Sequence, residues 1–385
     1  MNSNKELDYQ QVRAAFIETM QAQVKLTTKG TKCDSEMLWD VLGLASVTQS
    51  TLHSTCQSLE DVATSAGLLY QLRQGWLAQQ SLGQLEGQLN ELLAAQLPQG
   101  IVGRAHEVAF DMTEIPYHGQ AQERPEEVRR GKAKSGTTHF HVYASAYIIR
   151  RHKRVTVAVT YWQAEETVRA VFDRLYQRLS LLGVGIKRLL LDRQFCNVSI
   201  LQFLQQQSFQ SILPVPARSD ELRQLREEAS RSHRTTYTME SPQAGTVTIP
   251  LYVLRTYWKG RYGKQGVEVH FFTVLGPPWR DSFYRLGQKF RSRFGIESSY
   301  RLMNQVRART SSQDPKLRFL YVVLAFLLIN LWRTLSWSLL ALPRRGGRYL
   351  DESLFRFQRF CTFLFDAIRE AHQPVRAVVP PAAIP

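Results

Sequence analysis

The chain has 385 residues, and its 44% share of hydrophobic residues excludes an intrinsically disordered protein. A formal net charge of +16 favours a polyanionic partner, either nucleic acid or an acidic membrane surface. The charge is uneven: residues 1–100 carry a net charge of −4, and the remaining residues carry +20. Any phosphate-binding surface is therefore expected mainly after residue 100.

Four cysteines lie far apart and show no Cys-x-x-Cys or Cys/His ligand spacing, which suits a reducing cytosol and gives no zinc site. The first residues are polar and contain no signal-peptide core. No phosphate-binding glycine loop or Gly-x-Ser-x-Gly motif is present, so we expect neither a nucleotide cofactor nor serine hydrolysis.

Residues 1–100 are predicted to be helical, because apolar residues recur at helical spacing in 9–24 and 82–97. Between these stretches, residues 35–60 form two short helical segments around a turn. This pattern fits a helix-turn-helix whose second helix begins near Thr48 and enters DNA. It fits a small helical bundle for packing or dimerisation equally well.

After Pro98 the chain changes to an α/β pattern with a mixed sheet. Three strands are predicted, then a helix, a strand, a helix and a strand, at residues 107–113, 138–149, 154–162, 165–182, 186–192, 198–207 and 209–215. A charged stretch and two further strand-like runs then form a β-rich insertion before helices return at Asp281.

These changes predict five segments: a helical N-terminal domain (1–100), the first part of a catalytic core (101–216), the β-rich insertion (217–280), the second part of the core (281–345), and a C-terminal helix with a disordered tail (346–385). The apolar run 319–331 has only 13 residues before Trp332 and Arg333, whereas a bilayer requires roughly 20. We therefore expect a buried core helix there and no membrane partner.

Two aspartates occupy strand positions where a carboxylate needs an explanation. Asp111 lies within the strand run 107–113, where a charge is costly unless it is paired, hydrogen-bonded or bound to metal. Asp192 ends the apolar strand 186–192, and ligand sites in open α/β sheets gather at such ends. The alternatives are a solvated edge position for Asp111 and a turn-capping role for Asp192.

Glu297 is the only acid in the basic helical stretch 285–309. Phe290, Arg293, Glu297, Arg301 and Asn304 follow one another at three- and four-residue steps, so one regular helix would place them on a shared face. The alternative is a surface Glu paired with its arginine neighbours. Asp111, Asp192 and Glu297 together would suit two-metal phosphoryl transfer, in which carboxylates hold two Mg²⁺ ions, or Mn²⁺ as a substitute, in each active site.

The strings AFDMTEIPYHG, LLLDRQF and FRSRFGIESSYR resemble the three catalytic motifs of DDE transposases from insertion sequences. The resemblance covers roughly residues 105–310 and is nearest to the insertion-sequence-4 type, whose third motif reads Tyr-x2-Arg-x3-Glu-x6-Lys. It implies an RNase H-like fold with a β-rich insertion before the last Glu. It also implies that Asp111, Asp192 and Glu297 are catalytic metal ligands.

Arg293 falls on the Arg of that third motif. Phe290 stands where the motif has Tyr and Asn304 where it has Lys, while Arg301 could supply the missing cation. We expect the basic residues of this stretch to contact DNA, namely Lys289, Arg291, Arg293, Arg301, Arg307 and Arg309.

The implied function is cut-and-paste transposition: binding of terminal inverted repeats, cleavage there and strand transfer to target DNA, by a homodimer in the cytoplasm of a prokaryote, associated with the nucleoid. Some related enzymes form a DNA hairpin and hold a flipped base, for which Trp258 or Trp279 is a candidate, although both fit packing roles better. The competing hypotheses are a structure-selective nuclease on the same fold and a domesticated DNA-binding regulator.

Other polar groups are weaker candidates. Glu114 could be an alternative ligand but is expected to be one of the polar residues at a strand end, like Thr113 and His118. His139 and His141 resemble a metal pair without a third ligand. The basic residues of the run 123–136 suggest a flexible loop near DNA, with phosphate contacts from Arg129, Arg130, Lys132 and Lys134.

Overall fold

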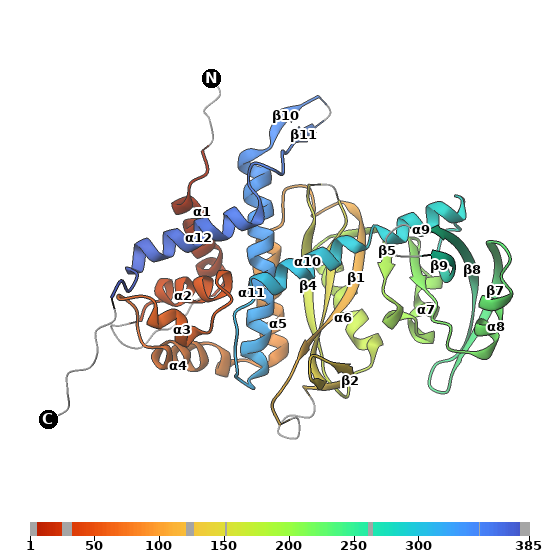
Figure 1. The fold of residues 1–385 in the computed structure, drawn as a ribbon, viewed down its shortest axis with the longest axis horizontal. Coiled ribbons are helices and arrows are strands. Elements are labelled where there is room, and N and C mark those ends of the chain that lie inside the picture. Colours follow the sequence, from red (N-terminus) through yellow and green to blue (C-terminus); the bar gives the residue numbers. More distant parts are fainter. Residues whose placement is uncertain are drawn as a thin grey trace. The chain divides into compact units, whose positions relative to one another are not determined.

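The computed structural model describes residues 6–24, 33–120, 127–150, 152–260, 265–345 and 347–377. The chain divides into two compact units. One is an α/β unit formed by Gln99–Ser298, and the other is a helical unit formed by Met1–Pro98 together with Ser299–Pro385 (Figure 1). The association of the two ends of the chain in one unit was not predicted from the sequence.

The helical unit contains α1–α5, the end of α10, and α11 and α12. Their bounds are α1 (Tyr9–Gln23), α2 (Ser35–Val47), α3 (Leu52–Gln57), α4 (Ser65–Gly75), a 3₁₀ turn (Leu77–Gln79), α5 (Leu82–Ala95), α10 (Phe294–Gln305), α11 (Pro315–Leu335) and α12 (Phe357–His372). Local sequence explains the helix starts, because Asp8 and Ser81 each form a reciprocal capping box with the Gln three residues later.

The apolar helix α11 forms the core of this unit and packs against α1, α2, α5 and α12. Pro315 at its first turn and the Asp314 cap define its start. With the π-helical turn Ser336–Leu340, it is long and apolar enough to span a membrane, yet 83% of its most apolar window is buried inside the protein. The burial agrees with the expected core helix.

Two features of the helical unit differ from expectation. The second helix of the possible helix-turn-helix, α3, begins at Leu52 rather than near Thr48 and has only six residues. A short hairpin, β10 (Leu342–Arg344) with β11 (Gly347–Tyr349), separates α11 from α12. It was not predicted, because three-residue strands carry no periodic signal.

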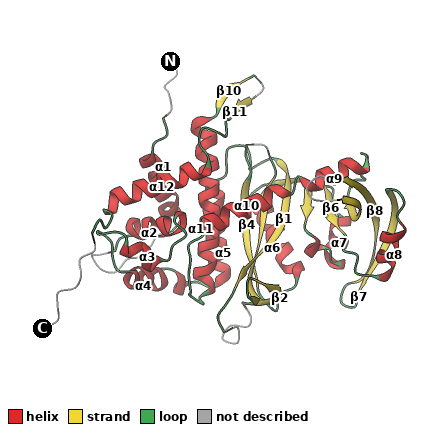
Figure 2. Ribbon diagram, in the orientation of Figure 1, coloured by secondary structure: helices red, strands yellow, loops and turns green. Residues whose placement is uncertain are grey.

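The α/β unit is built on one mixed sheet of nine strands, with helices packed on it (Figure 2). The strands are β1 (Ala105–Pro116), β2 (Arg129–Lys134), β3 (Thr137–Ile148), β4 (Val155–Trp162), β5 (Gly185–Leu191), β6 (Gln210–Pro214), β7 (His233–Ser241), β8 (Gly245–Lys259) and β9 (Gln265–Leu275). The helices are α6 (Val168–Leu181), α7 (Val198–Gln205), α8 (Asp220–Glu228), α9 (Phe283–Arg291) and the start of α10.

The first part of the sheet has the order β4-β3-β1-β5-β6. β1, β3 and β4 pair antiparallel, whereas β5 and β6 run parallel to β1. Helix α6 packs on β3 and β4 through an apolar stripe that includes Phe172 and Leu175. This arrangement is the mixed α/β fold expected from the sequence.

The segment 217–280 extends this same sheet. β9 pairs antiparallel with β6, and β8 and β7 follow in order, so these three strands continue the hydrogen bonding of the core strands. β7 was not predicted, because its residues are polar and their burial alternates only between half-buried and exposed. β2 was also missed: the run expected to be a flexible loop forms a strand at Arg129–Lys134, and residues 121–126 lie outside the described residues.

The single regular helix expected across 285–309 is wrong. α9 ends at Arg291 and α10 begins at Phe294, with Ser292 and Arg293 in a turn between them. The Ser292 hydroxyl donates to the Lys289 carbonyl at 2.6 Å, a local bond that competes with regular helical bonding. The Arg293 amide then bonds the Phe290 carbonyl, three residues back, at 3.0 Å.

Segment 281–345, expected as the second part of the catalytic core, is divided at Ser298. Residues up to Ser298 belong to the α/β unit, while the following residues group with the N-terminal helices. The physical reason is α11, whose apolar surface is buried by helices from the beginning of the chain. The tail from residue 378 lies outside the described residues.

Candidate active site

Asp111 and Asp192 are neighbours in the sheet. Asp111 lies in β1 and Asp192 directly follows β5, and the two strands pair in parallel with Phe110 in register with Leu191. The Asp192 side chain forms no capping bond with the described residues of the short turn that follows, Arg193–Phe195. The turn-capping alternative for Asp192 is therefore not what the structure shows.

Arg293 connects these aspartates to Glu297. Its guanidinium lies 2.7 Å from the Asp111 carboxylate, 3.3 Å from Glu297 and 3.7 Å from Asp192. Glu297 is in the first turn of α10 and its side chain is 47% exposed, whereas the side chains of Arg293 and Asp111 are only 9% exposed. The three predicted carboxylates and the motif arginine therefore converge on one place.

Burial raises the pKa of Asp111 to about 6. The guanidinium of Arg293 lowers this pKa, while the neighbouring charges of Asp192 and Glu297 raise it further. The Met112 amide donates to Asp111 at 2.9 Å and favours the ionised form. A buried carboxylate with two acidic neighbours is a site at which a cation lowers the free energy.

The donor chemistry of this cluster fits Mg²⁺, which prefers oxygen ligands and carboxylates above all. Asp111 supplies a nine-tenths buried carboxylate, and the side chains of Asp192 and Glu297 are 23% and 47% exposed. Among the described residues, no three acidic, His or Cys side chains lie close enough together to hold a metal ion. In the acidic cluster, the guanidinium of Arg293 lies between the carboxylates.

Lys289 is paired rather than exposed to a ligand. Its Nζ donates to both carboxylate oxygens of Glu107, at 2.9 and 3.1 Å, and Arg188 contacts the same carboxylate at 2.5 Å. Glu107 precedes Asp111 by four residues on β1, and Lys289 precedes Arg293 by four residues. Two ion pairs in register therefore hold the α9–α10 turn on β1. Glu107 was not predicted, because it lies in no motif and 182 residues separate it from Lys289.

The other predicted DNA contacts lie at the surface. Arg291 is exposed, with its guanidinium 5.3 Å from the centre of the Trp258 ring. Arg301 and Arg309 are exposed in the helical unit, and Arg307 is half-buried there. These side chains stay candidates for DNA binding.

The two tryptophans considered for base binding are half-buried. Trp258 donates its indole N–H to Glu268 at 2.9 Å, and Trp279 donates to the Ser282 carbonyl at 3.2 Å. Satisfied indole groups are typical of packing positions.

The weaker ligand candidates lie away from the acidic cluster or are packed. Glu114 is on the opposite face of β1 from Asp111, because side chains alternate along a strand. His141 is buried with its ring edge-on to Tyr117 at 5.2 Å. Arg129 lies over the Trp162 ring at 3.7 Å, which gives it a structural role, while Arg130, Lys132 and Lys134 are exposed.

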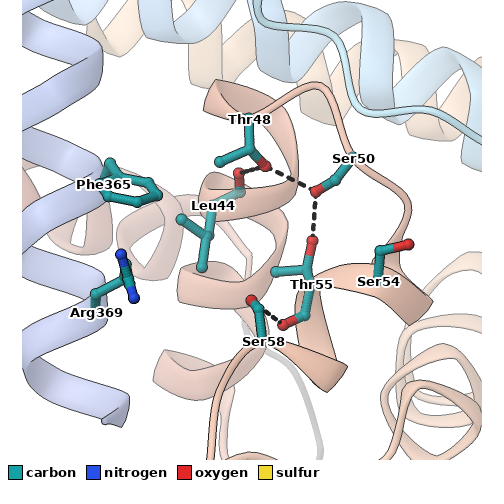
Figure 3. Close-up of a pocket in the computed structure, with 8 residues that line it drawn as sticks. All are labelled: Leu44, Thr48, Ser50, Ser54, Thr55, Ser58, Phe365 and Arg369. Carbon is teal, nitrogen blue, oxygen red and sulfur yellow. Dashed lines mark hydrogen bonds between the residues drawn. The ribbon is translucent and has the colours of Figure 1, made fainter. Parts of the chain in front are cut away.

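A pocket of about 320 Å³ lies in the helical unit and contains no carboxylate (Figure 3). The hydroxyls of Thr48, Ser50 and Thr55 form a chain of hydrogen bonds, each 2.7 Å long. Because these groups satisfy one another, the pocket offers a packed hydroxyl surface rather than a set of free donors.

Comparison with known proteins finds similarity among solved structures. No protein-family model matches the chain, and no curated protein matches it. Among solved structures, it is similar to piggyBac transposase in a synaptic complex with hairpin DNA, with a TM-score of 0.57 and 10% sequence identity over 97% of this chain and 84% of the other.

The chain shares its fold with a DNA transposase. The piggyBac likeness extends over both units, so it includes the helical unit as well as the sheet that carries Asp111 and Asp192. The likeness is one of fold, and the transposase class predicted from the three motifs stays a prediction. Membership of the insertion-sequence-4 branch stays a prediction.

Proposed function

We propose that the protein is a metal-dependent DNA transposase that cleaves element ends and joins them to target DNA. One observation carries the proposal: carboxylates from β1, from the end of β5 and from α10 converge on a single cation, in a fold shared with piggyBac transposase. We further propose that the core is RNase H-like. The strand order β4-β3-β1-β5-β6, with the last two strands parallel to β1, supports that assignment.

Asp111, Asp192 and Glu297 would hold the divalent ions, two per active site, with Mg²⁺ as the natural ion and Mn²⁺ as a substitute. Such ions activate a water or a DNA 3′-hydroxyl and stabilise the leaving oxygen. The chain's own part is to fix the carboxylates: Asp111 by burial in β1, Asp192 by the turn after β5, and Glu297 by the first turn of α10.

The DNA partner is proposed to be double-stranded, at the element ends and at the target, with a homodimer acting on paired ends in a prokaryotic cytoplasm. Support for the DNA partner comes from the net charge of +20 after residue 100. The exposed side chains of Arg291, Arg301 and Arg309 belong to this basic part of the chain.

The deciding experiment measures excision from the gene's own flanking DNA in cells and strand cleavage with purified protein. We expect Asp111→Asn, Asp192→Asn and Glu297→Gln each to reduce cleavage by at least about 10³-fold, since each removes a ligand of the proposed ions. DNA binding should stay within about twofold of wild type, because phosphate contacts dominate affinity.

Glu114→Gln is the matched control, since it removes a carboxylate from the opposite face of the same strand. Cleavage that persists in all three acidic variants would refute the proposal. Cleavage without joining would indicate a nuclease, and DNA binding without cleavage in wild type would indicate a regulator.

A further inference from the structure

Arg293 is placed where the acidic cluster needs a positive charge. Its side chain is nine-tenths buried and contacts Asp111, Asp192 and Glu297 at 2.7 to 3.7 Å. One guanidinium faces three carboxylates, so the cluster keeps a negative excess when all three are ionised. A divalent ion would neutralise that excess more completely than the arginine does.

The hydrogen bonding of Arg293 is incomplete. Its Nε–H is buried and has no hydrogen-bond partner among the described residues. Its Cζ lies 5.3 Å from the centre of the Phe290 ring, so one side of the guanidinium meets an aromatic surface rather than an acceptor. An unsatisfied buried donor is costly, and a phosphate oxygen is the kind of acceptor that would satisfy it.

Lys289 provides a contrast four residues earlier. Lys289 and Arg188 both contact the carboxylate of Glu107, so the negative charge of Glu107 is neutralised without a bound ion. Lys289 therefore has the geometry of a fixed anchor between α9 and β1. Arg293 lies in the turn between α9 and α10, beyond that anchor, and its neighbour Phe294 is 49% exposed.

We propose that Arg293 is an internal substitute for the metal, which closes the carboxylate cluster until divalent ions displace it. Guanidinium and metal then exclude each other from the cluster, and the displaced guanidinium becomes available to a DNA phosphate. This inference rests on the proposed function, because it requires that the carboxylates bind metal.

The test is titration calorimetry with Mn²⁺ alone, without DNA, on full-length protein. Arg293→Gln should bind Mn²⁺ about tenfold more tightly or better than wild type, since binding no longer breaks charged hydrogen bonds. Arg285→Gln is the control, because it removes an exposed cation of α9 that pairs with Asp281 and not with the cluster. Its Mn²⁺ affinity should equal that of wild type.

A third protein, Asp111→Asn, distinguishes failure of the proposed metal site from failure of the proposed role of Arg293. Suppose that wild type and Arg293→Gln bind Mn²⁺ equally well and Asp111→Asn does not bind it. This result would establish the metal site and overturn the proposal that Arg293 occupies it in the absence of metal. No Mn²⁺ binding in any protein would overturn both the metal-dependent function and this inference.

A measurement on wild type covers the case in which Arg293→Gln does not fold. Phenylglyoxal modifies accessible arginines, and mass spectrometry reports each site. Buried Arg293 should be protected without metal and modified faster once Mn²⁺ is added, while exposed Arg291 should react at the same rate in both conditions. Unchanged protection of Arg293 at saturating Mn²⁺ would overturn the proposal.

Discussion

Single buried charges organise both units of this protein. In the α/β unit, Asp111 is held by Arg293, and in the helical unit the fully buried Asp40 is held by Arg13 and His372. His372 closes α12 and its ring nitrogen lies 2.7 Å from the Asp40 carboxylate. A buried carboxylate that loses one partner carries an uncompensated charge, so each partner contributes strongly to the fold.

The Asp40–His372 pair predicts a pH-dependent stability. The hydrogen bond to Asp40 raises the pKa of His372, and this outweighs the opposing effects of burial and Arg13. The folded-state pKa is above the unfolded value of about 6.5, so the contribution is complete below that pH and is lost as the pH rises through the folded-state pKa. Thermal unfolding from pH 5.5 to 9 should show a decline in wild type that is reduced in His372→Gln. Parallel curves for the two proteins would contradict the prediction.

At this scale the sequence predicts four candidate residues that the structure places close together, but not all of the contacts around them. Asp111, Asp192, Glu297 and Arg293 were found because motif order and local context are visible in one dimension, and the structure brings them together. The pairing of Lys289 with Glu107 was not predicted, because 182 residues separate the partners and neither lies in a motif. A prediction of DNA contact for Lys289 considered only its charge.

At the scale of elements, helix packing in the helical unit depends on one close approach. A Cβ added to Gly43 in α2 would lie 2.8 Å from the Phe16 ring in α1, which is closer than carbon atoms pack. Phe16 is fully buried, so its ring has no free space into which it can move.

This contact predicts opposite effects for two Gly→Ala substitutions. Gly43→Ala should destabilise by about 1–3 kcal/mol through overpacking, although alanine has the better helix propensity. Gly87→Ala in α5 is the matched control, since no atom lies within 4 Å of the added Cβ, and it should stabilise by about 0.5–1 kcal/mol. Urea unfolding of both variants measures these changes. A stabilised Gly43→Ala would show that α1 and α2 are not packed this closely.

The elements were predictable where burial produces a pattern. The strands β3 and β4 were predicted from β-branched and aromatic runs and β5 from an apolar run, each with bounds within one residue of the structure, whereas β1 extends beyond both predicted ends. The polar strands β2 and β7 were missed because hydrogen bonds to a neighbouring strand, rather than apolar burial, define them. The turn between α9 and α10 was missed because a side-chain bond from Ser292 decides it.

At the scale of the whole molecule, the basic charge is expected to govern DNA affinity. Replacing Arg291, Arg301 and Arg309 with Gln should reduce the slope of log affinity against log salt by about 0.9 for each lost phosphate contact. Fluorescence anisotropy with duplex DNA at several salt concentrations measures that slope. Arg223→Gln is the control, because this exposed arginine is paired with Asp220 at 2.7 Å. An unchanged slope in the triple variant would place the DNA surface elsewhere.

The helical unit is formed by the two ends of the chain, and this has a consequence for protein synthesis. Helices α1 to α5 leave the ribosome first, but their packing partners, α12 on α1 and α2 and α11 on α5, follow the entire α/β unit. At a synthesis rate of about 5–20 residues per second, the early helices wait about 10–40 s for their partner. A nascent chain with such surfaces exposed is a substrate for chaperones. The unit that carries all three carboxylates is therefore translated in full before the helical unit can close its core.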